Sequence, residues 1–283
     1  TRLRASFVGM VLLSESEMAS TPLSKLAYQT LQQGKSIAGL AHKELSTKLM
    51  ELLAPDAVPK TEPVSAEVLG ELQLDMRKLQ EQDWQDAEQG IYPEELLFDA
   101  PWLVWVSRYP QVWMDLPSTW DRRRERNVHD LPKETDTALY PEYYLQNFHH
   151  QTDGYLSDHS AGLYDLQVEI LFNGTADAMR RRVLAPLKRG LKHFADRAPG
   201  SLKILDVATG TGRTLQQIRA AVPHAQLIGT DLSESYLRQA NRWLNDGDAS
   251  LVQLIRANGE SLPLADGSAV SYTHLRAHET NQD

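Results

Sequence analysis

Two aspartates and two glycines between positions 206 and 231 could together hold a nucleotide-type ligand. Gly210 and Gly212 stand two residues apart, where a tight turn requires positive φ and a ligand lying against the backbone requires the absence of Cβ. Asp206 precedes this turn, and Asp231 follows Gly212 by nineteen residues. In a strand-helix-strand unit, an acid at that distance can lie beside a ribose and accept its hydroxyls. The pattern therefore predicts a binding site for a nucleotide-type cofactor.

A buried strand and a helix must position the glycine turn. The run Ile204–Val207 is short and rich in β-branched residues, which is typical of an inner strand of a parallel sheet. After the turn, Leu215, Ile218 and Val222 recur at helical spacing. A helix that begins at the turn directs its free N–H groups back toward it, where a polar ligand group can accept them.

A second strand, Gln226–Thr230, leads directly into Asp231. Beyond it, apolar residues at helical spacing over 237–244 predict an amphipathic helix that Ser233 can cap. Leu251–Ile255 then predicts a third strand, followed by a loop. The alternation of strands and helices predicts an α/β fold with a parallel sheet.

Residues 201–268 resemble the class I S-adenosylmethionine-dependent methyltransferases, in particular the group around the quinone-biosynthesis C-methyltransferases. The family pattern Asp-x-Gly-x-Gly-x-Gly stands here as Asp206-Val-Ala-Thr-Gly-Thr-Gly212, with Ala208 in the first glycine position. Alanine fits there if its φ stays negative. The resemblance implies a Rossmann-like doubly wound sheet, C-terminally truncated in this chain and preceded by a mostly helical N-terminal region.

The resemblance also implies individual roles toward S-adenosylmethionine. Asp206 would orient the amino group of the cofactor, while Gly210 and Gly212 would admit its methionine part. Asp231 would accept both ribose hydroxyls. Asn258 stands where the family often has an aspartate that hydrogen-bonds the adenine amino group, and an amide oxygen can do the same. The whole predicted cofactor set is Asp206, Ala208, Thr209, Gly210, Gly212, Asp231, Leu232, Asn258, Gly259 and Glu260.

Two other functions fit parts of the pattern. Dinucleotide-dependent oxidoreductases also carry an acid after the second strand, but their loop is Gly-x-Gly-x-x-Gly, and the third glycine would fall at Leu215. A leucine cannot give the close helix-to-strand contact that glycine provides. A non-catalytic Rossmann-like protein, which binds a cofactor or assists assembly, is the other alternative. A methyltransferase acting on a small-molecule acceptor fits best.

The segment Tyr140–Ser157 is unusually rich in hydrogen-bonding side chains. In the resembling family, segments at this position often fold over the cofactor as a lid. We expect Tyr144, His149 and Tyr155 to line the acceptor side, where one of them deprotonates or positions the acceptor; a buried structural role is the alternative. No metal is expected, because the adjacent His149 and His150 point in different directions in a strand or helix and do not readily share one ion.

The remaining residues predict a mainly helical region with one strand. Pro22–Leu53 predicts a pair of helices broken near Gly34, and further helices are expected over 65–89, 160–172 and 176–194. The aromatic run Trp102–Val106 predicts a packed strand, in preference to a ligand cage. The two basic clusters, 122–126 and 180–182, are expected on solvated helix faces or against an acidic surface.

Composition narrows the class of protein. The chain has 283 residues, 41% of them hydrophobic and 24% charged, which is long enough for one large or two modest domains. A net charge of −9 argues against broad nucleic-acid binding, and the lack of cysteine excludes a disulfide scaffold, a cysteine zinc site and a cysteine nucleophile in this chain. No apolar run approaches the roughly eighteen residues of a membrane span. We therefore expect a cytoplasmic protein, or a plastid one if the source is eukaryotic. The oligomeric state cannot be read from these features.

Both ends of the chain differ from what such a protein is expected to carry. The chain begins at Thr1, and Met18 is a plausible start, so residues 1–17 are expected to be upstream sequence, with a leader peptide as the alternative. Val270–Thr280 resembles translated sequencing-adapter sequence, with a polar loop as the alternative.

The expected segments are upstream or leader sequence (1–18), a mostly helical region (19–139), a lid-like helical segment (140–200), half of a methyltransferase domain (201–268) and a non-native tail (269–283). Without a fourth strand, the first strand would keep an open edge, and residues 270–283 would be disordered.

Overall fold

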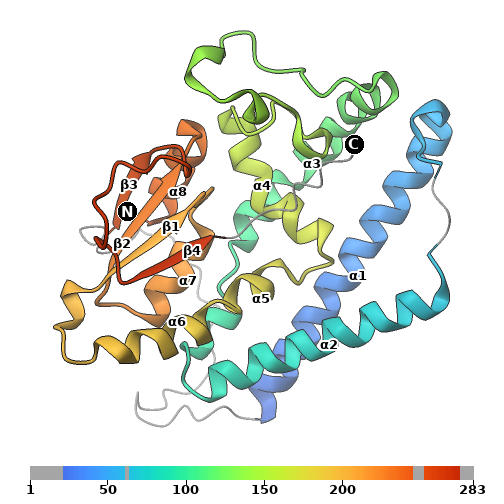
Figure 1. Cartoon of the computed structure of the whole chain (residues 1–283). Coiled ribbons are helices and arrows are strands. Elements are labelled where there is room, and N and C mark those ends of the chain that lie inside the picture. The colour runs from blue at the N-terminus through green and yellow to red at the C-terminus, as the bar shows by residue number, and fades with distance from the viewer. Residues whose placement is uncertain (1–21, 61–63, 245–251, 275–283) are drawn as a thin grey trace, which may run out of the picture.

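The computed structural model describes residues 22–60, 64–244 and 252–274, and within them a parallel sheet stands beside a helical body (Figure 1). The strands are β1 (Lys203–Val207), β2 (Gln226–Asp231), β3 (Val252–Arg256) and β4 (Ser271–His274). The longer helices are α1 (Pro22–Leu53), α2 (Ala66–Glu88), α3 (Trp102–Glu125), α4 (Asp158–Leu171), α7 (Arg213–Ala221) and α8 (Glu234–Leu244). Two short helices, α5 (Ala176–Arg181) and α6 (Leu184–Leu191), connect the body to the sheet.

The sheet has the order β3-β2-β1-β4, and all described pairings are parallel. From β1 the chain moves outward through β2 to β3, and then returns to the other side of β1 for β4. This reversal of direction is the mark of a doubly wound sheet and places a ligand crevice at the carboxyl ends of the central strands. The predicted Rossmann-like α/β architecture is confirmed, as are its first three strands.

β4 corrects the expectation for the end of the chain. Ser271–His274 pairs with β1 in parallel register, with Ser271 opposite Ile204 and His274 opposite Val207. The predicted open edge of the first strand and the predicted disorder of these four residues are therefore wrong. A buried, apolar strand offers unpaired backbone groups that an extended segment can complete. The expectation for 275–283 lies outside the described residues, and the non-native origin of 269–283 stays a prediction.

The two faces of the sheet are covered by different material. On one face, Ile204 and Leu227 pack with Leu215 of α7 and Ala240 of α8 in the largest apolar cluster. On the other face, a smaller cluster joins strand residues to the loop after β3: Leu205, Val207, Ile228, Leu262, Leu264 and Ala269. The helices α7 and α8 thus hold the strands from one side, while the loop over 257–270 seals the other.

α1 is one continuous helix instead of the predicted pair. A glycine inside a helix costs only about 1 kcal/mol relative to alanine, so Gly34 does not interrupt 32 residues of helix. The side chains that α1 buries are Tyr28, Gln32, His42 and Met50. Most of the leucines whose spacing predicted the helix lie instead on its exposed side.

Two further predictions in the helical body were wrong. Trp102–Val106 forms the start of α3, where Trp102 and Trp105 lie three residues apart and pack on the same cluster as Leu163 of α4. The buried aromatic residues here therefore recur with the period of a helix and do not alternate as in a strand. The predicted helix over 176–194 breaks between α5 and α6, because Pro186 cannot donate to the carbonyl of Arg182 and its ring clashes with it. The helices predicted over 65–89 and 160–172 are confirmed.

Buried ion pairs join the helical body together and to the sheet. Arg181 donates from Nη2 to Oδ2 of Asp83 over 2.7 Å, and the hydroxyls of Tyr28 and Tyr92 also donate to that carboxylate. The basic cluster 180–182 was expected on a solvated helix face or against an acidic surface, but Arg181 is almost fully buried, and the acid that it meets lies inside the protein. A cluster of basic residues can therefore mark a buried polar layer when acids on neighbouring helices face it. Arg122, from the other basic cluster, is buried as well, and it donates to the carbonyl of His150 over 3.0 Å.

A second buried pair links α5 to the glycine turn. Arg213, the first residue of α7, donates from Nε and Nη2 to both carboxylate oxygens of Asp177, at 3.1 and 2.8 Å. Burial alone would raise the pKa of Asp177, but the charge and hydrogen bonds of Arg213 outweigh it and hold that pKa below its ordinary value. Asp177 therefore stays ionised at neutral pH and keeps Arg213 in place.

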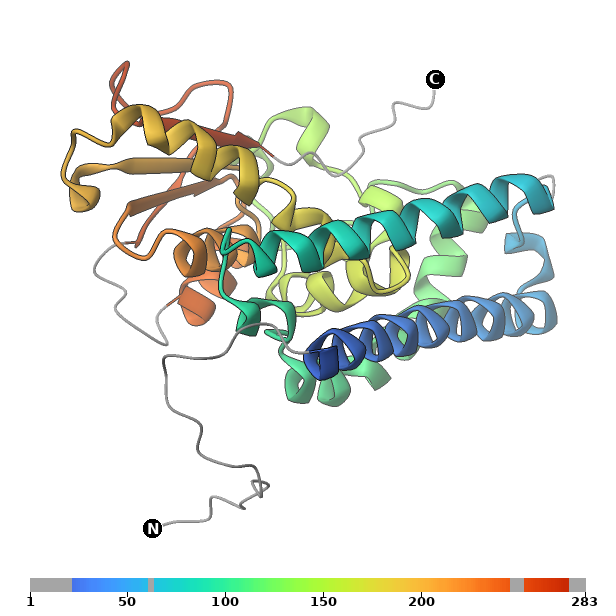
Figure 2. The ribbon, with the colours of Figure 1, turned by 90° about the horizontal axis from the view of Figure 1, so that it is seen from below.

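No helix within the described ranges combines the length and the apolar character that crossing a membrane requires. Figure 2 shows α1 and α2 as the two long helices of the body, and Trp84 of α2 packs in the same apolar cluster as Ile204 of β1.

Replacing Arg213 by methionine should lower the free energy of unfolding by about 2–4 kcal/mol, because the buried carboxylate of Asp177 loses its bidentate partner and keeps Arg180 as the remaining ion-pair partner. Urea denaturation measures the loss. Arg238→Met is the control, since Arg238 pairs with Asp158 at an exposed site, and its loss should stay below about 1 kcal/mol. Equal losses in the two variants would contradict the structural role of the buried pair.

Candidate cofactor site

The glycine turn connects β1 to α7 with three residues in the left-handed region. Ala208 has φ of 57°, Gly210 of 57° and Gly212 of 78°. The condition under which alanine fits without strain, a negative φ, is therefore not met. The family places glycine at this position, and the backbone here takes the path that glycine would take, at a cost of about 1–2 kcal/mol for a residue with a Cβ.

Gly210 and Gly212 are needed in the turn for different structural reasons. A Cβ on Gly212 would lie 2.9 Å from the Cβ of Ala240, so this glycine lets α8 approach the start of α7. A Cβ on Gly210 would meet only a ring carbon of Tyr236, at 3.9 Å. Gly210 therefore keeps the backbone accessible from the side on which the lid segment lies, as a cofactor cradle requires.

Helix α7 also approaches the sheet closely without the third glycine of a dinucleotide fingerprint. Leu215 stands where that glycine would be, and it is fully buried. The space comes from the strand, because a Cβ on Gly229 of β2 would lie 2.7 Å from Leu215. The sequence thus places the small residue on the strand and the large one on the helix.

Asp231 ends β2 and is the best-organised acid of the site. Its Oδ2 accepts from the backbone N–H of Gly210 and its Oδ1 from that of Ser233, both over 2.8 Å. Burial raises the pKa of Asp231 above its ordinary value, and the hydrogen bonds from the N–H groups of Ser233 and Gly210 oppose that rise. The carboxylate therefore fixes the position of the turn at the end of the strand.

Asp206 lies at the start of the turn, and neighbouring hydroxyls hold it. Thr209 donates to Oδ2 and Thr273 of β4 donates to Oδ1, each over 2.7 Å. The carboxylate is almost completely buried. Asp206 therefore links the turn to β4, a contact that sequence reasoning did not find because Thr273 lay in the segment interpreted as a tail.

The predicted adenine-binding residues lie on the loop that follows β3. The side-chain oxygen of Asn258 accepts from the backbone N–H of Glu260 over 3.0 Å, which forms a tight turn. A Cβ on Gly259 would lie 2.8 Å from Val207, so this loop passes over the end of β1. Leu232 lies between Asp231 and Ser233, and its carbonyl accepts from Arg256 over 3.1 Å. The three parts of the predicted cofactor set therefore meet at the carboxyl ends of β1, β2 and β3.

The predicted lid lies against the same strand ends. Its chain folds into short 3-10 turns, including Glu142–Tyr144 and Phe148–His150. The hydroxyl of Tyr144 donates to Oδ1 of Asp231 over 3.3 Å, and the hydroxyl of Ser233 donates to the carbonyl of Tyr155 over 2.5 Å. Of the three predicted catalytic residues, Tyr144 contacts Asp231 through its hydroxyl and Tyr155 contacts Ser233 through its backbone carbonyl, while the side chain of His149 lies outside the described set.

An aromatic cluster forms the underside of the lid. Phe148 stacks on Tyr155 with ring centroids 4.7 Å apart, and Tyr155 also contacts Tyr144, Tyr164 and Tyr236 at 5.4–6.0 Å. Sequence reasoning missed Tyr164 and Tyr236, which come from α4 and α8. The signal available for Tyr236 was its position three residues after the helix cap Ser233, on the side of the helix that faces the turn.

Tyr236 also carries the polar attachment of the lid. Its hydroxyl contacts the hydroxyl of Ser160 at 2.9 Å and accepts from the side-chain amide of Gln151 over 3.2 Å. Burial raises the pKa of Tyr236 well above its ordinary value. Tyr236 is therefore a neutral hydrogen-bonding group at neutral pH. In the part of the chain that the structure describes, no three His, Asp or Glu side chains are grouped to hold a metal ion.

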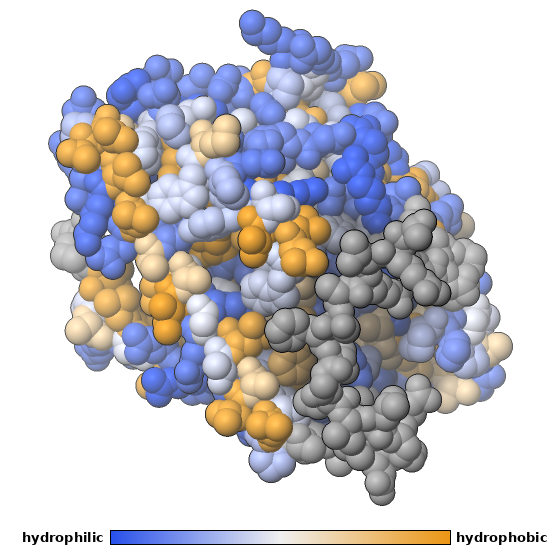
Figure 3. All heavy atoms as spheres, turned by 180° about the vertical axis from the view of Figure 1, so that it is seen from behind, coloured by the Kyte–Doolittle hydropathy of each residue, from blue (hydrophilic) through white to orange (hydrophobic). Residues whose placement is uncertain are grey.

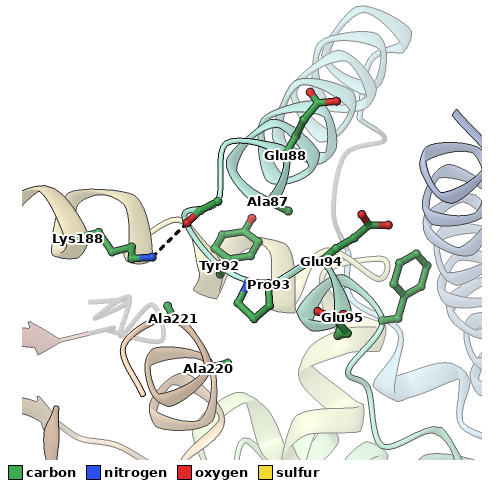
Figure 4. Close-up of a pocket in the computed structure, with 11 residues that line it drawn as sticks. Ala87, Glu88, Tyr92, Pro93, Glu94, Glu95, Lys188, Ala220 and Ala221 are labelled. Atoms are coloured by element: carbon green, nitrogen blue, oxygen red, sulfur yellow. Dashed lines mark hydrogen bonds between the residues drawn. The ribbon is translucent and has the colours of Figure 1, made fainter. Parts of the chain in front are cut away.

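One depression of the surface lies elsewhere. It has a volume of about 620 Å³ and lies where the end of α2 meets the end of α7. Figure 4 shows Glu88, Glu94 and Glu95 around it, with Lys188 donating to the carbonyl of Gly90. None of the predicted cofactor or catalytic residues lines this depression. The candidate site is instead the covered region between the glycine turn and the lid.

Residues 204–282 match the family model described as a methyltransferase domain. The sheet region is a class I methyltransferase domain. The match agrees with the strand order, the left-handed turn and the buried acid after β2. It does not favour the dinucleotide-dependent alternative.

Curated relatives of the methyltransferase domain act on different acceptors. The chain is 46% identical over 66 residues to a ubiquinone/menaquinone biosynthesis C-methyltransferase of Syntrophotalea carbinolica, covering 23% of this chain and 27% of that protein. It is 34% identical over 120 residues to the enzyme of the same name from Desulfotalea psychrophila, covering 42% and 44%. It is 33% identical over 99 residues to a malonyl-[acyl-carrier protein] O-methyltransferase of Methylococcus capsulatus, covering 34% and 33%. The chain thus spans less than half the length of each of these relatives.

Ala208→Gly should stabilise the methyltransferase domain by about 0.5–1 kcal/mol, because glycine adopts the φ of 57° without strain. Urea denaturation measures the gain. Ala38→Gly, at an exposed site inside α1, is the control and should lose about 1 kcal/mol. A loss of stability at position 208 would contradict the left-handed conformation of the turn.

Proposed function

We propose that this protein binds S-adenosylmethionine between the glycine turn and the lid, and transfers its methyl group to a small-molecule acceptor. The observation that carries the proposal is the carboxylate of Asp231. It is buried at the end of β2, it holds the backbone of Gly210, and it faces the aromatic lid. The match to a methyltransferase domain supports the choice of cofactor.

The residues of the site fit the chemistry of this cofactor. A ribose offers two hydroxyl donors, and Asp231 is an acceptor with two oxygens, each with two lone pairs. Gly210 leaves its backbone open toward the lid, and α7 begins directly after Gly212 with free N–H groups. Asn258 adds an amide on the loop over β1 for the adenine edge. These groups belong to different strands, so the sheet must form before they converge.

Tyr144 has a direct relation to cofactor binding. Its hydroxyl shares Oδ1 of Asp231 with the backbone N–H of Ser233, so that oxygen has both lone pairs engaged. Both ribose hydroxyls can bind Asp231 only if Tyr144 gives up its bond. Tyr144 thus holds the acid in the absence of ribose, and cofactor entry requires a movement of the lid.

Burial, followed by the neighbouring charge of Asp231, raises the pKa of Tyr144 well above its ordinary value. Its hydroxyl therefore stays protonated at neutral pH, where it can position a ligand but cannot remove a proton. Removal of a proton from a carbon or hydroxyl acceptor is assigned to His149 or Tyr155, the other two candidates on the lid.

S-adenosylmethionine supplies a methyl group on a positively charged sulfur, which is an excellent leaving group. The protein is left with three tasks: alignment of the acceptor, exclusion of water and, for an acidic acceptor, removal of a proton. The lid meets the first two, because its aromatic cluster covers the strand ends with apolar rings. The same rings favour a flat acceptor of quinone or phenol type, which agrees with the names of two of the relatives.

Asp231→Asn should weaken S-adenosylmethionine binding by about 2–3 kcal/mol, or roughly 30- to 160-fold, because the amide loses the charge that strengthens the bonds to ribose. Titration calorimetry on the whole chain measures this change. Asp266→Asn, an exposed carboxyl in the same domain, is the matched control and should leave affinity unchanged. Equal affinities in all three proteins, or tighter binding of a nicotinamide dinucleotide, would refute the proposed cofactor.

Tyr144→Phe should raise the affinity for S-adenosylmethionine by up to about tenfold, because the ring remains while the competing hydroxyl is lost. The variant should also retain methyl transfer, measured on a panel of demethylated quinols, phenols and amines. If the variant binds the cofactor with normal affinity but loses all methyl transfer, Tyr144 is a catalytic residue. Its hydroxyl then does not act by competing with ribose for Asp231. A wild-type protein that binds the cofactor and methylates no acceptor would favour the non-catalytic alternative.

A further inference from the structure

The outer face of α1 carries a stripe of exposed apolar side chains. Four large hydrophobic residues on this face are between 53 and 71% exposed: Leu23, Leu26, Ile37 and Leu40. Figure 3 views the molecule from behind and shows several hydrophobic patches between polar surroundings. An exposed apolar stripe along a helix is a frequent mark of a contact surface.

The opposite face of α1 is fully used by the protein itself. Tyr28 bonds Asp83 of α2, Lys35 pairs with Glu169 of α4, and His42 lies 3.1 Å from the hydroxyl of Tyr109 on α3. These contacts fix the rotation of the helix about its axis. The apolar stripe is thereby held toward solvent and cannot turn inward to join the core.

The spacing along the stripe is that of a coiled-coil seam. Leu23, Thr30 and Ile37 lie seven residues apart, and Leu26, Gln33 and Leu40 follow them with the same period. Together they occupy the two core positions of each heptad over two and a half heptads. The helix therefore has a contact surface made for another helix of similar length.

The same spacing is symmetric about the middle of the stripe. If two copies of α1 cross antiparallel about a two-fold axis between residues 31 and 32, Leu23 faces the partner subunit's Leu40. Leu26 then faces the partner subunit's Ile37, and Thr30 faces the partner subunit's Gln33. Each large apolar residue meets another, and each polar one meets a polar one. This self-complementarity is what an isologous dimer interface requires.

Size and charge favour the same partner. Ala27, Gly34 and Ala41 are exposed beside the seam at intervals of seven, and small residues there let two helix backbones come close.

Between Leu26 and Ala41 the one charged residue is Lys35, which is paired with Glu169. Two copies with a net charge of −9 each can meet here without like charges in contact. A neutral face also lacks the basic residues with which surface helices bind anionic membranes.

We propose that this protein forms a two-fold homodimer through antiparallel pairing of the outer face of α1. The interface centres on Leu26 and Ile37 and uses neither the cofactor site nor the lid. The seam extends over two and a half heptads of one helix from each partner, so we expect a small interface and a dimer that dissociates in the micromolar range.

Sedimentation velocity between about 1 and 100 μM tests the association. The wild-type chain should shift from monomer to dimer with concentration, and Ile37→Glu with Leu40→Glu should remain monomeric throughout. Leu103→Glu on α3, at a residue that is 89% exposed, is the matched control and should dimerise normally. Circular dichroism of the variants establishes that each one folds. A monomeric wild-type chain at every concentration would overturn the proposal, as would a dimer that Ile37→Glu and Leu40→Glu leave intact.

Disulfide trapping tests the register, since the chain has no cysteine of its own. A mixture of Leu26→Cys and Ile37→Cys proteins should cross-link on mild oxidation. Either variant alone should not, because its two thiols would lie eleven residues, or about 16 Å, apart along the paired helices, beyond the reach of a disulfide. Cross-linking of each variant with itself would mean a parallel pair and would refute the proposed symmetry. A monomer that sediments with neutral phosphatidylcholine vesicles would instead identify the stripe as a lipid contact.

Discussion

The bidentate ion pair between Asp177 and Arg213 is the constraint on which the arrangement of the site depends. Arg213 directly follows the second glycine of the turn, and Asp177 belongs to a helix that is itself held to α2 through Arg181 and Asp83. The helical body is therefore attached to the sheet at the start of α7, within one residue of the glycine turn. Any displacement of the body relative to the sheet would move that turn.

This attachment gives the helical region a defined relation to the lid. The lid runs directly into α4, and Arg122 near the end of α3 donates to the carbonyl of His150, in the middle of the lid, over 3.0 Å. The lid is thus held at its middle and at its C-terminal end by the same body that is locked to α7. In the proposed function the lid opens over Asp231 while these anchors stay fixed, which leaves the 3-10 turn Glu142–Tyr144 as the part that moves.

Sequence patterns were sufficient where the determinants are local. The glycine turn, the acid after β2 and the cap at Ser233 each depend on a few adjacent residues, and the structure has them where they were predicted. The failures arose where distant residues decide. Nothing local in Arg180–Arg182 reveals that acids from α2 and α4 face it, and the outward stripe of α1 has the same spacing that a core-facing stripe would have. The positive φ of Ala208 could not be read from the residue itself, because its neighbours set the path of the turn.

The bond from Thr273 to Asp206 determines at which stage of folding this protein can bind a ligand. The glycine turn is short and local, yet one oxygen of its first carboxylate is held by a residue 67 positions further along the chain. Parallel pairing of β4 must therefore precede the final shape of the turn, and such long-range closure is slow during folding. A nascent chain that has already made β1, α7 and β2 still lacks this last contact. Ligand binding would then become possible only late in synthesis, after β4 has paired with β1.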